Sequence, residues 1–331
     1  MKTLSVILLS TACILSLSGV DAQAQVPSNV MDAYKAYNAA MKAQDYDTAL
    51  TQGRKAWKMA ENAMGDNKTT GDLAFNYGFL EQARGNPKSA VKALTRAADL
   101  SDVGETRLER EVELVKTLEK VGDFDDAAKR SAKAQSFANS NGLAQTVYVG
   151  ELLVHDTNAC NRRAKLTVKK TRNPSGRTGS RVDLKSSPEK YTAKVQAQCA
   201  KLANRALDIF QSNPEMAQPK YVASAANSVG YSHERKGDYL EAALSYQISR
   251  NAIEESLGRQ NGLVAHTIGR WVNARARIKF DGKLEQAKAA GLCDCWPYKQ
   301  DTPKVEILDT GSSVSSSYTL NNQFGSGYAI L

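Results

Sequence analysis

A seven-residue turn signature that recurs four times constrains the fold of this chain more than any other feature. Its copies are QDYDTAL at 44–50, GNPKSAV at 85–91, GDFDDAA at 122–128 and GDYLEAA at 237–243. In each copy an Asp or Asn follows a Gly or Gln, and an alanine stands four residues later. Gly tolerates the left-handed conformation that ends one helix, and Asp or Asn caps the next. Each copy therefore predicts a helix, a tight turn and a second helix.

Small residues follow each signature with a fixed spacing. They stand four and eleven residues after the capping Asp or Asn, at Ala49, Ala90, Ala127 and Ala242, then at Ala56, Ala97, Ala134 and Ser249. This spacing places both residues of a copy on one face of the second helix, where it packs closely against its neighbour. The predicted helix pairs are 28–43 with 45–63, 71–84 with 86–100, 104–121 with 123–139, 142–156 with 189–211, 217–236 with 238–257, and 261–279 with 281–290.

The pattern resembles the tetratricopeptide repeat family, whose unit is a pair of antiparallel helices of about 34 residues. Gly78 and Gly230 stand eight residues before the second-helix cap, where the family also has a small residue. Tyr37 and Val115 depart from this pattern, and two of the cap spacings, 45 to 86 and 86 to 123, exceed the family's unit length. The resemblance implies an all-α, right-handed solenoid of antiparallel helix pairs over residues 25–291. An irregular helical bundle with alanine-rich interfaces is the alternative.

Residues 1–24 have the pattern of a signal peptide. Lys2 precedes an apolar stretch that runs through Val20, and Ala22-Gln23-Ala24 forms a small-x-small cleavage site. We therefore expect a mature chain that begins at Gln25 and is exported, to a bacterial periplasm or as a secreted protein. No later stretch of the sequence is long and apolar enough for a membrane span, so none is expected after cleavage.

A basic insertion separates the two helices of the fourth pair, and we predict a loop over 157–188. Residues 161–190 contain ten Lys or Arg and only two acidic residues, nearly the whole net charge of +9. The candidate contact residues are Arg162, Arg163, Lys165, Lys169, Lys170, Arg172, Arg177 and Arg181. Such a loop suits an anionic envelope surface, or it is a solvated loop. Because no aromatic residue precedes Tyr191 to stack bases, we do not expect nucleic-acid binding.

The cysteines fit an oxidising compartment, because four of them remain after cleavage. Cys160 and Cys199 flank the insertion and are predicted to form a disulfide. Cys293 and Cys295, in the sequence CDCW, form a second structural pair, a redox-active pair or half a metal site. No His lies at metal-ligand spacing from them, which favours the structural pair. The C-terminal tail, 292–331, is expected to be irregular or to contain short strands.

The search for chemistry along the chain finds no catalytic motif. The three histidines are isolated within predicted helices, and phosphate-binding or dinucleotide-binding glycine loops are absent from the sequence. We therefore expect a protein that is not an enzyme and that needs neither a cofactor nor a metal. One interpretation is an exported scaffold for a protein or peptide partner. The other is the repeat arm of a TonB-like envelope protein, although only 35 residues follow Trp296, too few for a complete TonB-like module.

The tetratricopeptide resemblance implies that the first helix of each pair lines a concave groove for the partner. Phe75 and Phe79 could instead be ordinary core residues, because Tyr77 and Leu80 compete for the same helix. Counted from the caps, the implied groove residues are Tyr34, Asn38, Lys42, Phe75, Phe79, Gln82, Lys116, Lys120, Asn227, Tyr231 and Arg235.

Overall fold

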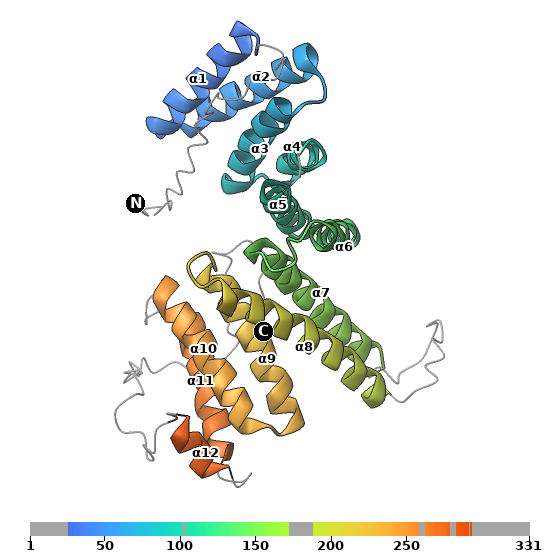
Figure 1. The fold of residues 1–331 in the computed structure, drawn as a ribbon, viewed down its shortest axis with the longest axis vertical. Helices are drawn as coiled ribbons and strands as arrows, with labels where there is room; N and C mark the ends of the chain where they lie inside the picture. Colours follow the sequence, from blue (N-terminus) through green and yellow to red (C-terminus); the bar gives the residue numbers. More distant parts are fainter. Residues whose placement is uncertain are drawn as a thin grey trace, which may run out of the picture. The chain divides into compact units, whose positions relative to one another are not determined.

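The computed structural model describes residues 26–101, 104–171, 188–257, 262–278, 283–290 and Leu292, and all regular structure in them is helical (Figure 1). The chain divides into two compact units, with the boundary after Gly65. The first contains α1 (Ser28–Lys42) and α2 (Tyr46–Met64). The second contains α3 (Lys68–Ala83), α4 (Pro87–Asp99), α5 (Glu105–Val121), α6 (Phe124–Ser140), α7 (Val147–Thr171), α8 (Pro188–Ser212), α9 (Pro219–Lys236), α10 (Tyr239–Leu257), α11 (Gly262–Ile278) and α12 (Leu284–Ala289).

Helices that follow one another in the chain pack against one another. In the first unit α1 packs on α2, and in the second unit the pairs α3 with α4, α5 with α6, α7 with α8 and α9 with α10 are in contact. The first helices also contact one another in order, α3 with α5, α5 with α7 and α7 with α9. This arrangement is that of a helical solenoid. It confirms the predicted all-α class and the first five of the six predicted helix pairs.

The turns between paired helices have the predicted geometry, except that the Asn86 side chain makes no cap hydrogen bond to α4 and donates to Glu81 instead. Asp45 and Asp123 cap α2 and α6, each accepting a hydrogen bond from the backbone N–H three residues later. Gly85, Gly122 and Gly237 adopt positive φ angles of 84°, 86° and 85°. Gln44 takes the same place in the first turn and is the one non-glycine residue with positive φ (57°) among those described. The turn geometry therefore persists where the sequence departs from glycine, and Gln44 is strained.

The small residues of the signature lie where the paired helices approach most closely. Ala49, Ala56, Ala90, Ala97, Ala127, Ala134, Ala242 and Ser249 are all buried. A Cβ added to Gly78 would stand 2.9 Å from Leu94 Cγ, and one added to Gly230 would stand 2.7 Å from Tyr246 Cδ1. The prediction of close helix packing at these positions is confirmed.

The structure corrects the boundary of the basic insertion. We predicted a loop from 157, but α7 continues to Thr171 and α8 begins at Pro188. Residues 157–171 contain neither Gly nor Pro, and eight of the 15 are Arg, Lys, Ala or Leu, which favour helix, so positive charge alone was a poor indicator of a loop. Arg162, Arg163, Lys165, Lys169 and Lys170 therefore lie on α7. Arg172, Arg177 and Arg181 lie outside the described residues.

A glycine that the sequence analysis overlooked fixes how α7 and α8 pack. A Cβ on Gly150 would stand 2.6 Å from the Phe210 ring, as one on Gly230 would meet Tyr246. Gly230 and Tyr246 are 16 positions apart, whereas Gly150 and Phe210 are 60 apart, an excess of 44 residues. The extra residues lengthen α7 and α8 past the point at which the turn lies in the other helix pairs. We call residues 157–171 of α7 and 188–202 of α8 the hairpin extension.

The predicted disulfide is present, and it lies within the hairpin extension. Cys160 and Cys199 are joined, with their Cα atoms 5.5 Å apart. The bond links α7 to α8, which lie side by side (Figure 1). The predicted signal peptide, the tail 293–331 and the pair Cys293–Cys295 lie outside the described residues. None of the helices that the structure describes is long and apolar enough to cross a membrane.

Candidate functional site

The candidate site is the face that the first helices α3, α5, α7 and α9 present away from their partners; we call it the first-helix face. On α3, Phe79 is 47% exposed, while Phe75 is half-buried against the core. Their rings lie 6.0 Å apart. Gln82 is buried and donates a hydrogen bond to the Thr117 hydroxyl at 2.5 Å, so it joins α3 to α5 and has little surface to offer.

Three lysines meet on this face, from two helices that are distant in sequence. Lys116 and Lys120 come from α5, and Lys220 comes from α9; together we call them the lysine cluster. Burial and the positive charge of Lys116 lower the pKa of both Lys120 and Lys220. Lys116 contacts Glu113 at 3.0 Å, and the Lys220 ammonium lies 4.7 Å from the centre of the Tyr221 ring. Mutual repulsion among the half-buried Lys116 and Lys120 and the exposed Lys220 favours the binding of an anion.

Glu151 of α7 lies beside the lysine cluster and is almost completely buried. Its side chain accepts a hydrogen bond from Gln218 at 3.1 Å. Burial raises its pKa to about 7, against the attraction of Lys220 and together with repulsion from Glu113. At neutral pH this carboxyl is thus only partly ionised, and it neutralises the cluster only in part.

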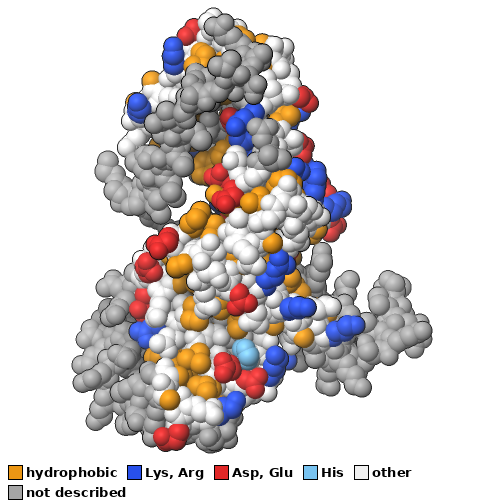
Figure 2. Space-filling view, in the orientation of Figure 1, with side chains coloured by type: hydrophobic (Ala, Val, Ile, Leu, Met, Phe, Trp, Pro, Cys, Tyr) orange, Lys and Arg blue, Asp and Glu red, His pale blue; other side chains and the backbone are white. Residues whose placement is uncertain are grey.

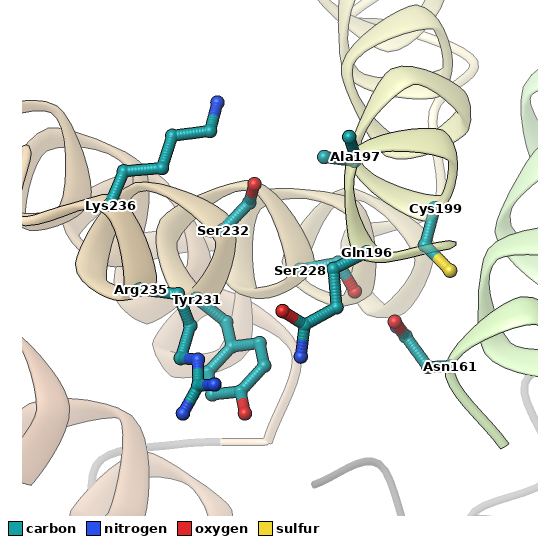
Figure 3. A pocket seen from close by; sticks show the side chains of 10 residues that line it. Asn161, Gln196, Ala197, Cys199, Ser228, Tyr231, Ser232, Arg235 and Lys236 are labelled. Atoms are coloured by element: carbon teal, nitrogen blue, oxygen red, sulfur yellow. The ribbon is translucent and has the colours of Figure 1, made fainter. Parts of the chain in front are cut away.

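The groove residues predicted on α9 fall into two groups. Asn227 is buried, and its side-chain oxygen has no hydrogen-bond partner among the described residues. Tyr231 and Arg235 line a pocket of about 170 Å³ between α7, α8 and α9 (Figure 3), which we call the junction pocket. Its other lining residues are Asn161, Gln196, Ala197, Cys199, Ala200, Ser228, Ser232 and Lys236. In Figure 3 the side chains of Gln196, Tyr231 and Arg235 extend to one side, whereas that of Lys236 points away.

The first unit has its own predicted groove residues, which lie on α1. Tyr34 and Asn38 are half-buried on α1 and Lys42 is exposed. The ring of Tyr34 stacks on that of Tyr37 with the centroids 6.0 Å apart. Because Tyr37 is part of the contact between α1 and α2, this stacking holds Tyr34 in place at the edge of the unit's core.

Only part of the basic insertion can be described at the level of side chains. Arg162 donates to Glu119 at 2.8 Å, and its guanidinium lies 4.6 Å from the Phe124 ring centre. Glu119 also contacts the buried His155 at 2.7 Å. Arg162 is therefore a structural link from α7 to α5 and α6. In the view of Figure 2, basic and acidic side chains are interspersed over the described surface, and no patch of one sign stands out there.

No group of three His, Cys, Asp or Glu side chains that could hold a metal ion is found in the described part of the chain. Of these candidate residues, the sequence analysis named Lys116, Lys120, Tyr231 and Arg235, and it did not name Lys220, Glu151, Asn161 and Gln196. Glu151 directly follows Gly150, so the overlooked glycine was the signal that could have placed it on the first-helix face.

Comparison with known proteins adds the following. No protein-family model matches the chain, and no curated protein matches it. Among solved structures, the chain is similar to the crystal structure of BtubC (BKLC) from P. vanneervenii, with 15% sequence identity and a TM-score of 0.42. The match covers 85% of this chain and 97% of that one.

Proposed function

We propose that this protein is an exported, tetratricopeptide-like scaffold that binds an acidic segment of a protein or peptide partner along its first-helix face. In this proposal the helix pairs wind into a right-handed solenoid, and the protein performs no catalysis. The lysine cluster is the observation that carries the proposal. Three ammonium groups gather there against Glu113 and the partly protonated Glu151, which leaves positive charge for a carboxylate to neutralise.

The exposed aromatic on the same face supports a peptide as the partner. Phe79 presents a large apolar ring to solvent, whereas the neighbouring Phe75 packs against the core. An interface commonly joins apolar anchors to charged contacts that steer the partner and fix its orientation. Export is supported by the predicted signal peptide and by the Cys160–Cys199 disulfide, since disulfides persist mainly in oxidising compartments.

Affinity capture from an envelope extract tests the function. The bait is the mature protein, compared with the double variant Lys116→Gln/Lys120→Gln and with a control that removes two exposed lysines from second helices, Lys88→Gln/Lys201→Gln. We expect the first variant to lose a partner that the control retains at low salt, and the difference between the two to shrink as salt is added because the contacts are screened. A partner captured equally by all three baits would refute the role of the lysine cluster. N-terminal sequencing of the protein from cell fractions tests export.

A further inference from the structure

The junction pocket has the chemistry of an anion site. Its charged lining residues, Arg235 and Lys236, are both cationic, although the Lys236 side chain points away (Figure 3), and the rest of its polar lining consists of amides and hydroxyls. No carboxylate in the described ranges forms an ion pair with Arg235, whose side chain is exposed. Arg270 of α11 does not line the pocket, but its guanidinium lies 5.4 Å from the centre of the Tyr231 ring, which does.

The pocket exists because of the hairpin extension. Asn161, Gln196, Cys199 and Ala200 all belong to the extension, and they face the last turns of α9. Without the extra residues, α7 and α8 would end before reaching these turns. The Cys160–Cys199 bond holds the two walls from α7 and α8 together beside the pocket.

The pocket lies at a defined separation from the lysine cluster. Lys220, Tyr231 and Arg235 are 11 and 15 positions apart on α9, which is about three and four helical turns, so they share one side of the helix. At about 1.5 Å per residue the two cationic centres are roughly 16–22 Å apart along α9. An extended peptide covers that span with about five to seven residues, at about 3.3 Å per residue.

Building on the proposed function, we propose that the junction pocket is a second anchor for the same partner and accepts the carboxylate of an acidic side chain. That side chain stands about five to seven residues from the acidic group that binds at the lysine cluster. The planar guanidinium of Arg235 is suited to a carboxylate, because its N–H groups can donate to both oxygens. The Tyr231 ring offers apolar contact to the aliphatic part of the side chain, and Asn161 and Gln196 offer amide donors.

Synthetic peptides with two Glu-Glu pairs test the spacing. The probes are fluorescein-labelled peptides in which about six Gly and Ser residues, or about one, separate the pairs. Fluorescence anisotropy at low salt measures their binding to the mature wild-type protein, to Arg235→Gln, to Lys116→Gln/Lys120→Gln and to the control Lys201→Gln. We expect Arg235→Gln to weaken binding of the long peptide by about five- to tenfold, and Lys201→Gln to change it less than about twofold. The short peptide should bind more weakly and be insensitive to Arg235→Gln.

The outcomes separate this inference from the proposed function. If Lys116→Gln/Lys120→Gln weakens binding but Arg235→Gln matches the control, the pocket is not an anchor and the proposed function stands. If neither variant differs from the control, both proposals fail. Arg235 also stands near the C-terminal end of α9, where a cation stabilises the helix. A lower melting temperature of Arg235→Gln with unchanged affinity would therefore overturn the anchor and leave only that structural role.

Discussion

Replacing Glu151 by Gln should stabilise the protein, and the gain should depend on pH. The side chain is 4% exposed, and burial raises its pKa from 4.5 to about 7. Since the folded-state pKa lies above the unfolded one, the folded state holds the proton more tightly. Below pH 4.5 the carboxyl is neutral in both states and its ionisation costs nothing. The cost of burying the charge then grows as the pH rises, and it is complete above about pH 7.

The size of this effect follows from the pKa difference. A rise from 4.5 to about 7 corresponds to about 3 kcal/mol of folding free energy at high pH. Glu151→Gln removes that cost and keeps an oxygen that can accept from Gln218. We therefore expect a gain of about 2–3 kcal/mol at about pH 8 that shrinks toward zero at about pH 4.

Urea unfolding followed by circular dichroism at about pH 4, 6 and 8 measures this difference. Glu215→Gln is the matched control, because Glu215 is an exposed carboxylate between α8 and α9 and should change the stability by less than about 0.5 kcal/mol at each pH. A gain that is the same at all three pH values, or a loss at high pH, would show that burial of the charge is not what raises the pKa. Binding of an acidic peptide should also be tighter at about pH 6 than at about pH 8, because Glu151 is then largely protonated.

Three further substitutions test the packing. Gln44→Gly should stabilise the first unit by about 0.5–1 kcal/mol in thermal unfolding, since glycine relieves the positive φ at a small entropic cost; a destabilised variant would contradict the assigned strain. Gly230→Ala should cost about 1–3 kcal/mol because its Cβ would collide with the Tyr246 ring, whereas Gly85→Ala, where a Cβ meets nothing, should show only backbone strain. Removing the disulfide with Cys160→Ser/Cys199→Ser should cost up to about 4 kcal/mol for a closed loop of this length, and unchanged urea unfolding would argue against a bond in solution.

The sequence could predict most of the fold because the turn signature is local. A cap such as Asp123 and a turn glycine such as Gly122 are recognisable within a few residues, and they determine where one helix ends and the next begins. The small residues then indicate the face that packs. The fourth pair has no such turn next to its core. The boundaries of its helices could therefore be inferred only from a contact between Gly150 and Phe210, which are 60 positions apart.

Residues of the candidate site could be predicted only where counting positions along a helix was enough to place them. Counting from the caps placed Lys116, Lys120, Tyr231 and Arg235 on the first-helix face. Counting could not show that Gln82 turns inward to Thr117, because that depends on how closely α3 approaches α5. It also could not bring Lys220 to the α5 lysines, since that meeting depends on the packing of α7 between α5 and α9.

The hairpin extension changes how the basic segment should be interpreted. A charged loop in a repeat array can vary freely without affecting the rest of the fold, but this segment begins as two helices joined by a disulfide. Its first turns form two walls of the junction pocket, and Arg162 connects it to Glu119 of α5. The extension is thus coupled to the neighbouring pairs at its base. The hairpin extension therefore affects partner binding through the shape of the junction pocket and through Arg235 of α9. This effect does not require that the basic side chains beyond Arg162 touch the partner.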